Sequence, residues 1–317
     1  MPSVESRRGP GTTERGDRRP ALLASVADRL GSAREARWIL EFVEAESQAP
    51  LAAGELHRQV EALVARRGSG EPLQYVLGRW PFRSLELTVD PRVLIPRPET
   101  EQVVEVALAE LARICADPAV GPPTGALVPS VVAPVCVDLG TGSGAIALAL
   151  ATEAGPRFPA IEVWATDASA DALEVAGQNL GFLSRRDAAA GARVRLAQGS
   201  WLAALPTELM GRVDLIVANP PYVSVSEYAD LDPEVRDWEP KEALVAPSGA
   251  GGVGGTADIE EIVGTAPRWL RSGGGLVVEI APAQAPTAID AALRAAFASV
   301  THATDLTGRI RMLVARR

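Results

Sequence analysis

The stretch Val137-Asp138-Leu139-Gly140-Thr141-Gly142-Ser143-Gly144-Ala145 decides the fold class of this chain of 317 residues. It starts within an apolar run, Val135–Leu139, that is typical of a buried strand, passes through a glycine-rich turn and enters a helix. Glycine lets the backbone turn sharply and approach a ligand, and the helix N-terminus beyond it offers free N–H groups. The spacing also satisfies the G-x-G-x-x-A dinucleotide fingerprint, and a plain structural turn is a further alternative. The stretch therefore predicts an α/β domain with a cofactor-binding turn.

Downstream of this turn, strands and helices alternate. We expect strands at Val135–Leu139, Glu162–Thr166, Val194–Ala197, Val213–Ala218, Gly275–Ile280 and Arg309–Val314. We expect helices between them at Ala145–Glu153, Ala170–Leu180, Ile259–Leu270 and Ala288–Phe297. Apolar strands that alternate with helices indicate a doubly wound, mostly parallel sheet.

Upstream of the turn, the pattern divides into four segments. Residues 1–20 are polar and rich in arginine and predict a disordered tail, and residues 21–70 predict three or four short helices that form a small docking domain. Residues 71–98 predict short strands, one at Tyr75–Leu77 and a hairpin with alternating Leu85, Leu87 and Val89, which link this domain to the next. Residues 99–317, opening with a helix at Thr100–Ile114, form the α/β domain.

Composition excludes several classes of protein. Two cysteines cannot build a disulfide framework, and Cys136 is expected to be a small buried hydrophobic residue. Two histidines far apart in the sequence argue against a metal site. No apolar run reaches the ~18–20 residues that span a bilayer, and no signal peptide opens the chain, so a soluble, cytoplasmic protein without a membrane contact is expected. The net charge of −9 argues against direct binding of nucleic acid.

Asp167 closes the second expected strand, Glu162–Thr166. A carboxylate at the carboxyl end of this strand can accept hydrogen bonds from both hydroxyls of a ribose. This position fits NAD and S-adenosylmethionine equally, so it predicts an adenosine-type cofactor without naming it. A helix N-cap is the structural alternative, since Asp167 also precedes the next helix.

Asn219-Pro220-Pro221-Tyr222 follows the strand Val213–Ala218, and open α/β sheets bind ligands at this end of their strands. The two prolines remove N–H donors, so the Asn219 side-chain oxygen and the Pro220 carbonyl can accept both protons of a substrate NH2 group. Tyr222 offers a flat face for stacking. The segment predicts methyl transfer to a planar nitrogen, either an amide or an exocyclic amine, and favours S-adenosylmethionine over NAD.

With these motifs, the chain resembles the N5-glutamine methyltransferases of the HemK family, which act on peptide chain release factors. The most specific part of the resemblance is Leu94-Ile95-Pro96-Arg97-Pro98-Glu99-Thr100-Glu101, and Glu71–Gly78 and Glu239-Pro240 also fit. The resemblance covers about residues 21–317. It implies a seven-stranded, Rossmann-like class I S-adenosylmethionine methyltransferase domain, preceded by a small helical domain and a β-hairpin linker.

The resemblance also implies substrate, cofactor and site. The substrate is the glutamine of the GGQ tripeptide in a bacterial class 1 release factor, the product S-adenosyl-L-homocysteine, and the enzyme a monomer without a metal. Cofactor-binding residues are Gly140, Thr141, Gly142, Ser143, Gly144, Asp167, Trp201 (beside the adenine) and Asn219. Catalytic and substrate-binding residues are Asn219, Pro220, Pro221 and Tyr222. Arg97 and Glu99 also belong to the substrate-binding set, and together with Glu101 they order the wall of the site, with a surface salt bridge as the alternative. The helical domain docks the release factor.

Three features depart from the family pattern. Ser200 stands where relatives often have Asp, which puts an acidic contact to the adenine in doubt; Ser84 replaces a glycine; and the glycine-rich segment Gly249–Gly255 is either a flap or a lengthened loop. Three alternatives stay open: a ribosomal-protein glutamine methyltransferase, an adenine-N6 methyltransferase of nucleic acid, and a noncatalytic protein that binds release factor or ribosome.

Overall fold

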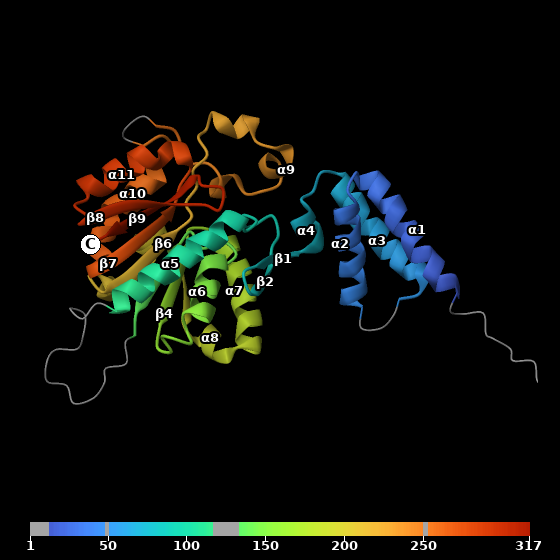
Figure 1. The fold of residues 1–317 in the computed structure, drawn as a ribbon, viewed down its shortest axis with the longest axis horizontal. Helices are drawn as coiled ribbons and strands as arrows, with labels where there is room; N and C mark the ends of the chain where they lie inside the picture. The colour runs from blue at the N-terminus through green and yellow to red at the C-terminus, as the bar shows by residue number, and fades with distance from the viewer. Residues whose placement is uncertain (1–12, 48–50, 117–132, 250–252) are drawn as a thin grey trace, which may run out of the picture. The chain divides into compact units, whose positions relative to one another are not determined.

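The chain divides into two compact units, Met1–Gly78 and Arg79–Arg317. The structure is a computed structural model, and it describes residues 13–47, 51–116, 133–249 and 253–317. Each unit has its own hydrophobic core. In Figure 1 the first unit runs from dark blue to blue-green and the second from blue-green to red.

The first unit is helical. It consists of α1 (Thr13–Leu30), α2 (Ala33–Glu46), α3 (Ala53–Gly68) and α4 (Leu73–Leu77). The Ser32 hydroxyl caps α2 by accepting a hydrogen bond of 3.2 Å from the backbone N–H of Glu35. Apolar side chains at helical spacing meet in one core, made of Val26, Ala36, Ile39, Leu40, Val43, Val60, Val64 and Leu73. The helical pattern expected for residues 21–70 is confirmed.

Two expectations for this unit need correction. Helix α1 begins at Thr13, so residues 13–20 are helical rather than disordered, while residues 1–12 lie outside the described residues. A polar, arginine-rich composition does not exclude a helix, because Arg and Glu are good helix formers.

The strand expected at Tyr75–Leu77 is wrong, because these residues belong to helix α4. The Pro72 carbonyl accepts hydrogen bonds from the N–H groups of Tyr75 and Val76, both at 3.0 Å, and Gly78 ends the helix in a left-handed conformation. An apolar run this short has no periodicity that separates strand from helix.

The second unit opens with the expected hairpin. Strands β1 (Arg79–Phe82) and β2 (Leu85–Thr88) pair in antiparallel fashion. Arg83 occupies the turn with a φ of 51°, and its N–H donates to Glu101 Oε1 at 2.9 Å while its guanidinium pairs with Glu153. Ser84 stands beside it, so the left-handed position of this turn is carried by Arg83 rather than by a glycine.

A seven-stranded sheet forms the centre of the second unit, in the order β5-β4-β3-β6-β7-β9-β8. Its strands are β3 (Val135–Leu139), β4 (Glu162–Asp167), β5 (Val194–Gln198), β6 (Val213–Ala218), β7 (Leu270–Glu279), β8 (Ser299–Thr304) and β9 (Ile310–Arg316). The first five in spatial order are parallel, and β9 pairs in antiparallel fashion with both of its neighbours, β7 and β8. The sequence pattern did not indicate β8, because it is an edge strand whose residues are polar and partly exposed.

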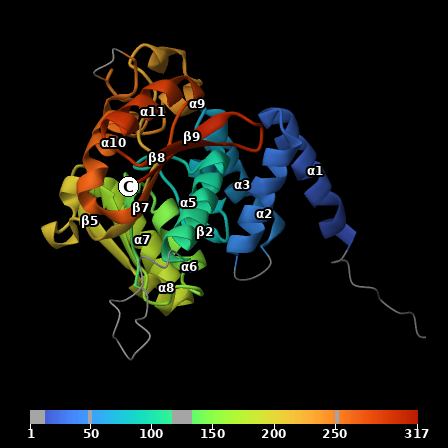
Figure 2. The ribbon, with the colours of Figure 1, turned by 60° about the vertical axis from the view of Figure 1, so that its left-hand side comes forward.

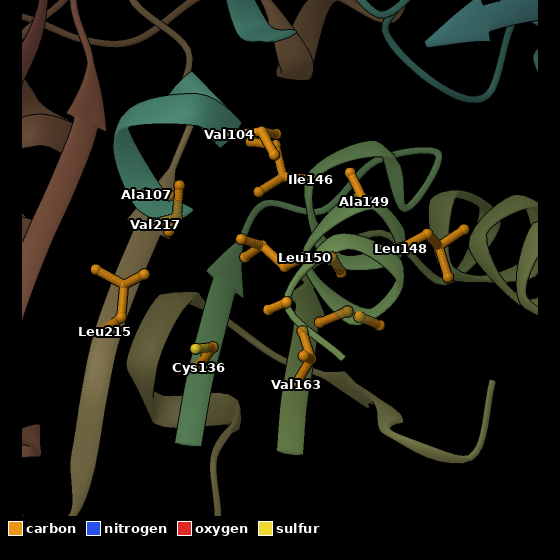
Figure 3. Close-up of a cluster of buried hydrophobic side chains, with 14 of the residues drawn as sticks. Val104, Ala107, Cys136, Ile146, Leu148, Ala149, Leu150, Val163, Leu215 and Val217 are labelled. Carbon is orange, nitrogen blue, oxygen red and sulfur yellow. The ribbon is translucent and has the colours of Figure 1, made fainter. Parts of the chain in front are cut away.

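Helices cover both faces of the sheet, as Figures 1 and 2 show. Helices α5 (Pro98–Ala116), α6 (Ala145–Glu153), α7 (Ala170–Arg186) and α8 (Ala188–Ala192) share one core with the sheet. Helices α10 (Ala257–Trp269) and α11 (Ala285–Arg294) share the other, and α9 (Pro233–Arg236) lies in the segment between β6 and α10. Figure 3 shows Val104 of α5 beside Ile146 of α6, and Cys136 and Val163 on the strands of the same cluster. Cys136 is fully buried there, as expected.

Strand register brings the predicted site together. Leu139 of β3 pairs with Thr166 of β4 and with Ala218 of β6, and Ala218 pairs with Val278 of β7. The four residues that come next along these strands therefore line up at the carboxyl edge of the sheet, namely Gly140, Asp167, Asn219 and Glu279.

Candidate active site

A cavity of about 570 Å³ lies at this carboxyl edge, which is where open α/β sheets bind ligands. One wall comes from the strand ends and the turns after them, and the other from segments before α5 and before α10. The lining residues are Arg92, Val93, Leu94, Gly140, Gly142, Asp167, Ala168, Ser169, Ala172, Gly199, Ser200, Trp201, Asn219, Pro221, Pro240, Glu242, Ala243 and Asp258. The volume lies within the ~300–1,000 Å³ typical of small-molecule sites.

The sequence-predicted residues separate into two groups. Six of them line the cavity: Gly140, Gly142, Asp167, Trp201, Asn219 and Pro221. The others lie outside its lining: Thr141, Ser143, Gly144, Pro220, Tyr222, Arg97, Glu99 and Glu101. Three members of this second group, Thr141, Tyr222 and Arg97, make contacts that fasten the segments around the cavity.

The glycine turn is fastened to the strand that precedes it. The buried Asp138 Oδ2 accepts hydrogen bonds from Thr141 Oγ1 at 2.6 Å and from the N–H of Ala147 in α6 at 3.0 Å. Gly140 has a φ of 69°, and a Cβ on it would approach Cζ3 of Trp201 to 3.2 Å. Glycine is required here because the turn is left-handed and an indole ring packs directly against it.

Asp167 extends from the end of β4 into the cavity. Its Oδ2 accepts a hydrogen bond from the N–H of Gly142 at 2.9 Å, and its Oδ1 accepts one from the N–H of Ser169 at 2.9 Å. Burial raises the pKa of Asp167 above its usual range. Ser169, not Asp167, caps helix α7, since its hydroxyl accepts from the N–H of Ala172. The helix-cap alternative for Asp167 is therefore excluded.

Trp201 begins a short 3-10 helix, Trp201–Ala204, with a φ of 44° that is unusual for a residue other than glycine. Its indole interacts with the carboxylate of Asp258, the second residue of α10, and this interaction opposes the effect of burial on the pKa of Asp258. Burial raises the pKa of Asp258, and both residues line the cavity. Ser200 is exposed, so the acidic group on this side of the cavity comes from Asp258.

Asn219 is half-buried at the end of β6, and its two amide atoms have different surroundings. Its Nδ2 donates to Thr100 Oγ1 at 3.2 Å, and Thr100 Oγ1 donates to Glu279 Oε2 at 2.8 Å. Its Oδ1 is buried and has no hydrogen-bond partner in the protein; among the described residues only Asp138 Oδ1 and Trp164 Nε1 share this condition. A buried acceptor without a partner is costly, which marks Asn219 Oδ1 as a site for a ligand N–H.

Glu279 is 2% exposed, and burial raises its pKa from 4.5 to about 7. Because the folded pKa lies above the unfolded one, the unfolded chain loses this proton first as the pH rises. At pH 8 the wild-type protein is therefore destabilised by its buried carboxylate, and Glu279→Gln removes this cost. We expect the difference in free energy of unfolding, Glu279→Gln minus wild type, to be roughly 3 kcal/mol larger at pH 8 than at pH 4. Urea unfolding curves of both proteins at the two pH values measure this difference, and an equal gap at both would contradict the raised pKa.

Tyr222 is fixed through its backbone. The Gln284 side chain, which is buried, donates from Nε2 to the carbonyl of Tyr222 at 2.8 Å and to the carbonyl of Gly255 at 3.0 Å. Burial raises the pKa of the Tyr222 hydroxyl. Gly255 packs so closely on Tyr222 that a Cβ would overlap the Tyr222 carbonyl oxygen, so this end of the glycine-rich segment is a packed element rather than a free flap.

Arg97 pairs with the carboxylate of Glu239, whose side chain is only 1% exposed. The other oxygen of Glu239 accepts the N–H of Ile95 at 3.0 Å. This carboxylate joins the segment before α5 to the segment that supplies Pro240, and both line the cavity. A surface salt bridge is therefore excluded for Arg97. Glu101 instead accepts the backbone N–H of Arg83 in the hairpin turn, and Glu99 is half-buried.

Five residues of this site had no assigned role in the sequence analysis: Thr100, Glu239, Glu279, Gln284 and Asp258. Glu279 carries a signal that could have identified it, because a single acid that ends an apolar strand in a parallel sheet lies at the ligand-binding edge. Gln284 and Asp258 carry none, because their partners lie far away in the sequence.

No helix in the described part of the chain is both long and apolar enough to cross a membrane. No group of three or more His, Cys, Asp or Glu side chains among the described residues is arranged to hold a metal ion.

Comparisons with known proteins identify the family to which the sequence is similar. Residues 124–231 match the family model described as "Methyltransferase small domain". The release factor glutamine methyltransferase of Gloeobacter violaceus is 40% identical over 82% of this chain and 80% of its own length. That of Streptomyces coelicolor is 42% identical over 73% of each chain. A crystal structure of a release factor-specific protein-(glutamine-N5) methyltransferase from Alicyclobacillus acidocaldarius covers 73% of this chain and 99% of its own, at 24% identity and a TM-score of 0.37.

The seven-stranded sheet, with a glycine turn after its central strand and the match to the methyltransferase model, defines a class I S-adenosylmethionine-dependent methyltransferase. The level and extent of identity to the sequence relatives then place the chain within a family. It belongs to the release factor glutamine methyltransferases.

Proposed function

We propose that this enzyme transfers a methyl group from S-adenosylmethionine to the side-chain amide N5 of the glutamine in the GGQ motif of a bacterial class 1 release factor. The observation that carries the proposal is the buried, unpaired Asn219 Oδ1 in the wall of the cavity, which is suited to accept an amide N–H. Family membership supports the choice of a protein glutamine over a nucleobase. Docking of the release factor is assigned to the helical unit.

The residues of the cavity fit S-adenosylmethionine. The Asp167 carboxylate would accept hydrogen bonds from the ribose hydroxyls, and the Trp201 ring would lie beside the adenine. The backbone from Gly140 to Gly144 would hold the amino-acid end of the molecule, close to Asn219. When bound, S-adenosylmethionine supplies a methyl group that is already activated by its sulfonium charge.

The residues of the protein would position the glutamine amide nitrogen, which is a poor nucleophile. Asn219 Oδ1 and the Pro220 carbonyl would accept both N–H bonds of the glutamine amide, and Tyr222 would stack on its flat face. Pro220 and Pro221 have no N–H donors and restrict the backbone, so the acceptors stay in place. Holding both N–H bonds favours a pyramidal nitrogen with its lone pair directed at the methyl group. Such positioning can contribute ~7 kcal/mol or more to lowering the barrier without a strong base.

The proposal is tested by incubating the enzyme with labelled S-adenosylmethionine and, in parallel, a purified class 1 release factor, ribosomal proteins and DNA. We expect label on the release factor alone, located to the GGQ glutamine by mass spectrometry. A release factor whose GGQ glutamine is replaced by alanine is the matched control and should stay unlabelled. Label on ribosomal protein or on adenine instead would overturn the proposal.

Asp167→Ala is expected to weaken binding of S-adenosylmethionine by about 10- to 150-fold, the range for loss of hydrogen bonds to a charged group. Calorimetric titration of the purified variant measures the dissociation constant. Asp167→Asn is the matched control: it keeps one acceptor oxygen, which can bind the N–H of either Gly142 or Ser169, and it should lose less affinity than Asp167→Ala. An unchanged constant in Asp167→Ala would reject the assigned role.

A further inference from the structure

The side chain of Asn219 is held by a chain of hydrogen bonds whose members come from three elements. Asn219 follows β6, Thr100 lies in the first turn of α5, and Glu279 ends β7. The two links measure 3.2 Å from Asn219 Nδ2 to Thr100 Oγ1 and 2.8 Å from Thr100 Oγ1 to Glu279 Oε2. Thr100 and Glu279 are 4% and 2% exposed, so water does not compete freely for these bonds.

The direction of the chain follows from the chemistry of its end groups. An ionised carboxylate only accepts hydrogen bonds, so Glu279 takes the one proton of the Thr100 hydroxyl. The Thr100 oxygen can then only accept from Asn219, and the asparagine must offer it the NH2 group. The amide oxygen of Asn219 is consequently the atom left without a partner, as observed.

We infer that Thr100 and Glu279 are positioning residues for methyl transfer, which set the orientation of the Asn219 amide so that its oxygen, not its nitrogen, meets the substrate amide. This inference rests on the proposed function and extends it to two residues that lie outside the cavity lining. A chain of hydrogen bonds that ends on a carboxylate also polarises each member, which makes Asn219 Oδ1 a stronger acceptor.

Protonation of Glu279 reverses the chain. A neutral carboxyl group donates its proton to Thr100 Oγ1, the Thr100 hydroxyl then donates to Asn219, and the amide turns its oxygen toward Thr100. The NH2 group of Asn219 would then face the substrate amide, which leaves no acceptor for the substrate N–H. Methyl transfer therefore requires the ionised form of Glu279.

The groups around Glu279 place this change near neutral pH. Burial raises the pKa of Glu279 to about 7, against the opposing effects of Arg311 on β9 and of Arg97. The charge of Glu99 also raises the pKa of Glu279. The Tyr222 hydroxyl, whose own pKa is raised by burial, faces Glu279 as a neutral group. Arg311 is held by Asp305 at 3.2 Å, so this cation is already paired.

The test uses the full-length enzyme with Thr100→Val, Thr100→Ser and Glu279→Gln. Valine has the shape of threonine without its hydroxyl. We expect Thr100→Val to lower kcat by about 10- to 30-fold, because the loss of a hydrogen bond that orients a buried group costs this much. The KM for the release factor should change little. Thr100→Ser restores the hydroxyl and should recover most of the activity. Equal kcat in Thr100→Val and wild type would overturn the inference.

The pH profile separates positioning from a general structural effect. Wild-type kcat is expected to fall about tenfold from pH 8 to pH 6, as for a single required ionised group with a pKa near 7. Glu279→Gln lacks the titrating proton, and its amide oxygen can accept from the Thr100 hydroxyl at every pH, so its kcat should be only about threefold lower than wild type at pH 8 and should not follow this fall. A wild-type profile that Glu279→Gln reproduces would contradict the inference.

A readout without substrate distinguishes failure of this inference from failure of the proposed function. The NMR signals of the Asn219 side-chain NH2 group, assigned by their loss in Asn219→Ala, should shift with a midpoint near pH 7 in wild type and not in Glu279→Gln. If no release factor is methylated but this titration is seen, the proposed substrate is wrong and the inferred chain of hydrogen bonds from Glu279 to Asn219 is supported. Absence of the titration in wild type overturns the inference that Glu279 orients Asn219 through hydrogen bonds.

Discussion

Asn219→Ala is expected to lower kcat for methyl transfer by about 10³-fold. The alanine removes the acceptor that holds one N–H of the glutamine amide, and the loss of one such preorganised group typically costs 10²–10³ in kcat. The two prolines after Asn219 stay in place, so the remaining wall of the cavity is kept. Labelled methyl incorporation at saturating substrate measures the change, and turnover within tenfold of wild type would remove Asn219 from the mechanism.

Binding and stability provide the controls for this variant. The dissociation constant for S-adenosylmethionine should stay within about threefold, since Asp167 and Trp201 are untouched. The free energy of unfolding should change by no more than about 1 kcal/mol, because the alanine also removes the buried, unpaired Oδ1 and its cost. Asn219→Asp keeps an acceptor oxygen and should retain more turnover than Asn219→Ala. A large loss of stability in Asn219→Ala would show that Asn219 acts mainly in folding.

Most of the second unit could be predicted from local pattern. The strand, glycine turn and helix of Val135–Glu153 are dictated by neighbours in the sequence, and apolar strands that alternate with helices define the class of fold. The strand that was not expected, β8, has only two apolar residues that pack on the cores, Val300 and Ala303, and is fixed by its pairing with β9. Helix α4 was misread because five residues are too few to show a period.

The site was predictable only where its residues follow strands. Asp167 and Asn219 were found because each comes directly after an apolar strand, and the register of a parallel sheet brings such positions together. Glu239 and Gln284 act on residues distant in the sequence, Ile95 and Tyr222, and only the fold reveals these pairs. Motif reading thus found the groups that face the cavity, but it missed the partners that hold them from distant parts of the sequence, such as Glu239 and Gln284.

Gly255→Ala is the second substitution with a large expected effect, and it tests whether the glycine-rich segment belongs to the site. Gly255 has a φ of 72°, and a Cβ would overlap the Tyr222 carbonyl oxygen and lie 2.9 Å from Gln284 Nε2. The left-handed backbone alone costs an alanine about 1–2 kcal/mol, and overpacking adds about 1–3 kcal/mol. Relief of the overlap requires Tyr222 to move, so we expect loss of kcat by at least about tenfold together with a lower Tm.

Gly211→Ala is the matched control, because Gly211 has a similar φ of 69° with no atom within 4 Å of the added Cβ. It should show only the backbone cost and keep wild-type turnover, so the difference between the two variants isolates the contact with Tyr222. Because the Tyr222 carbonyl also accepts from Gln284, displacement of this carbonyl would break the bond that joins the substrate-facing segment to the start of α11. Should Gly255→Ala and Gly211→Ala lose the same stability and keep the same kcat, the segment would be a lengthened loop with no part in positioning Tyr222.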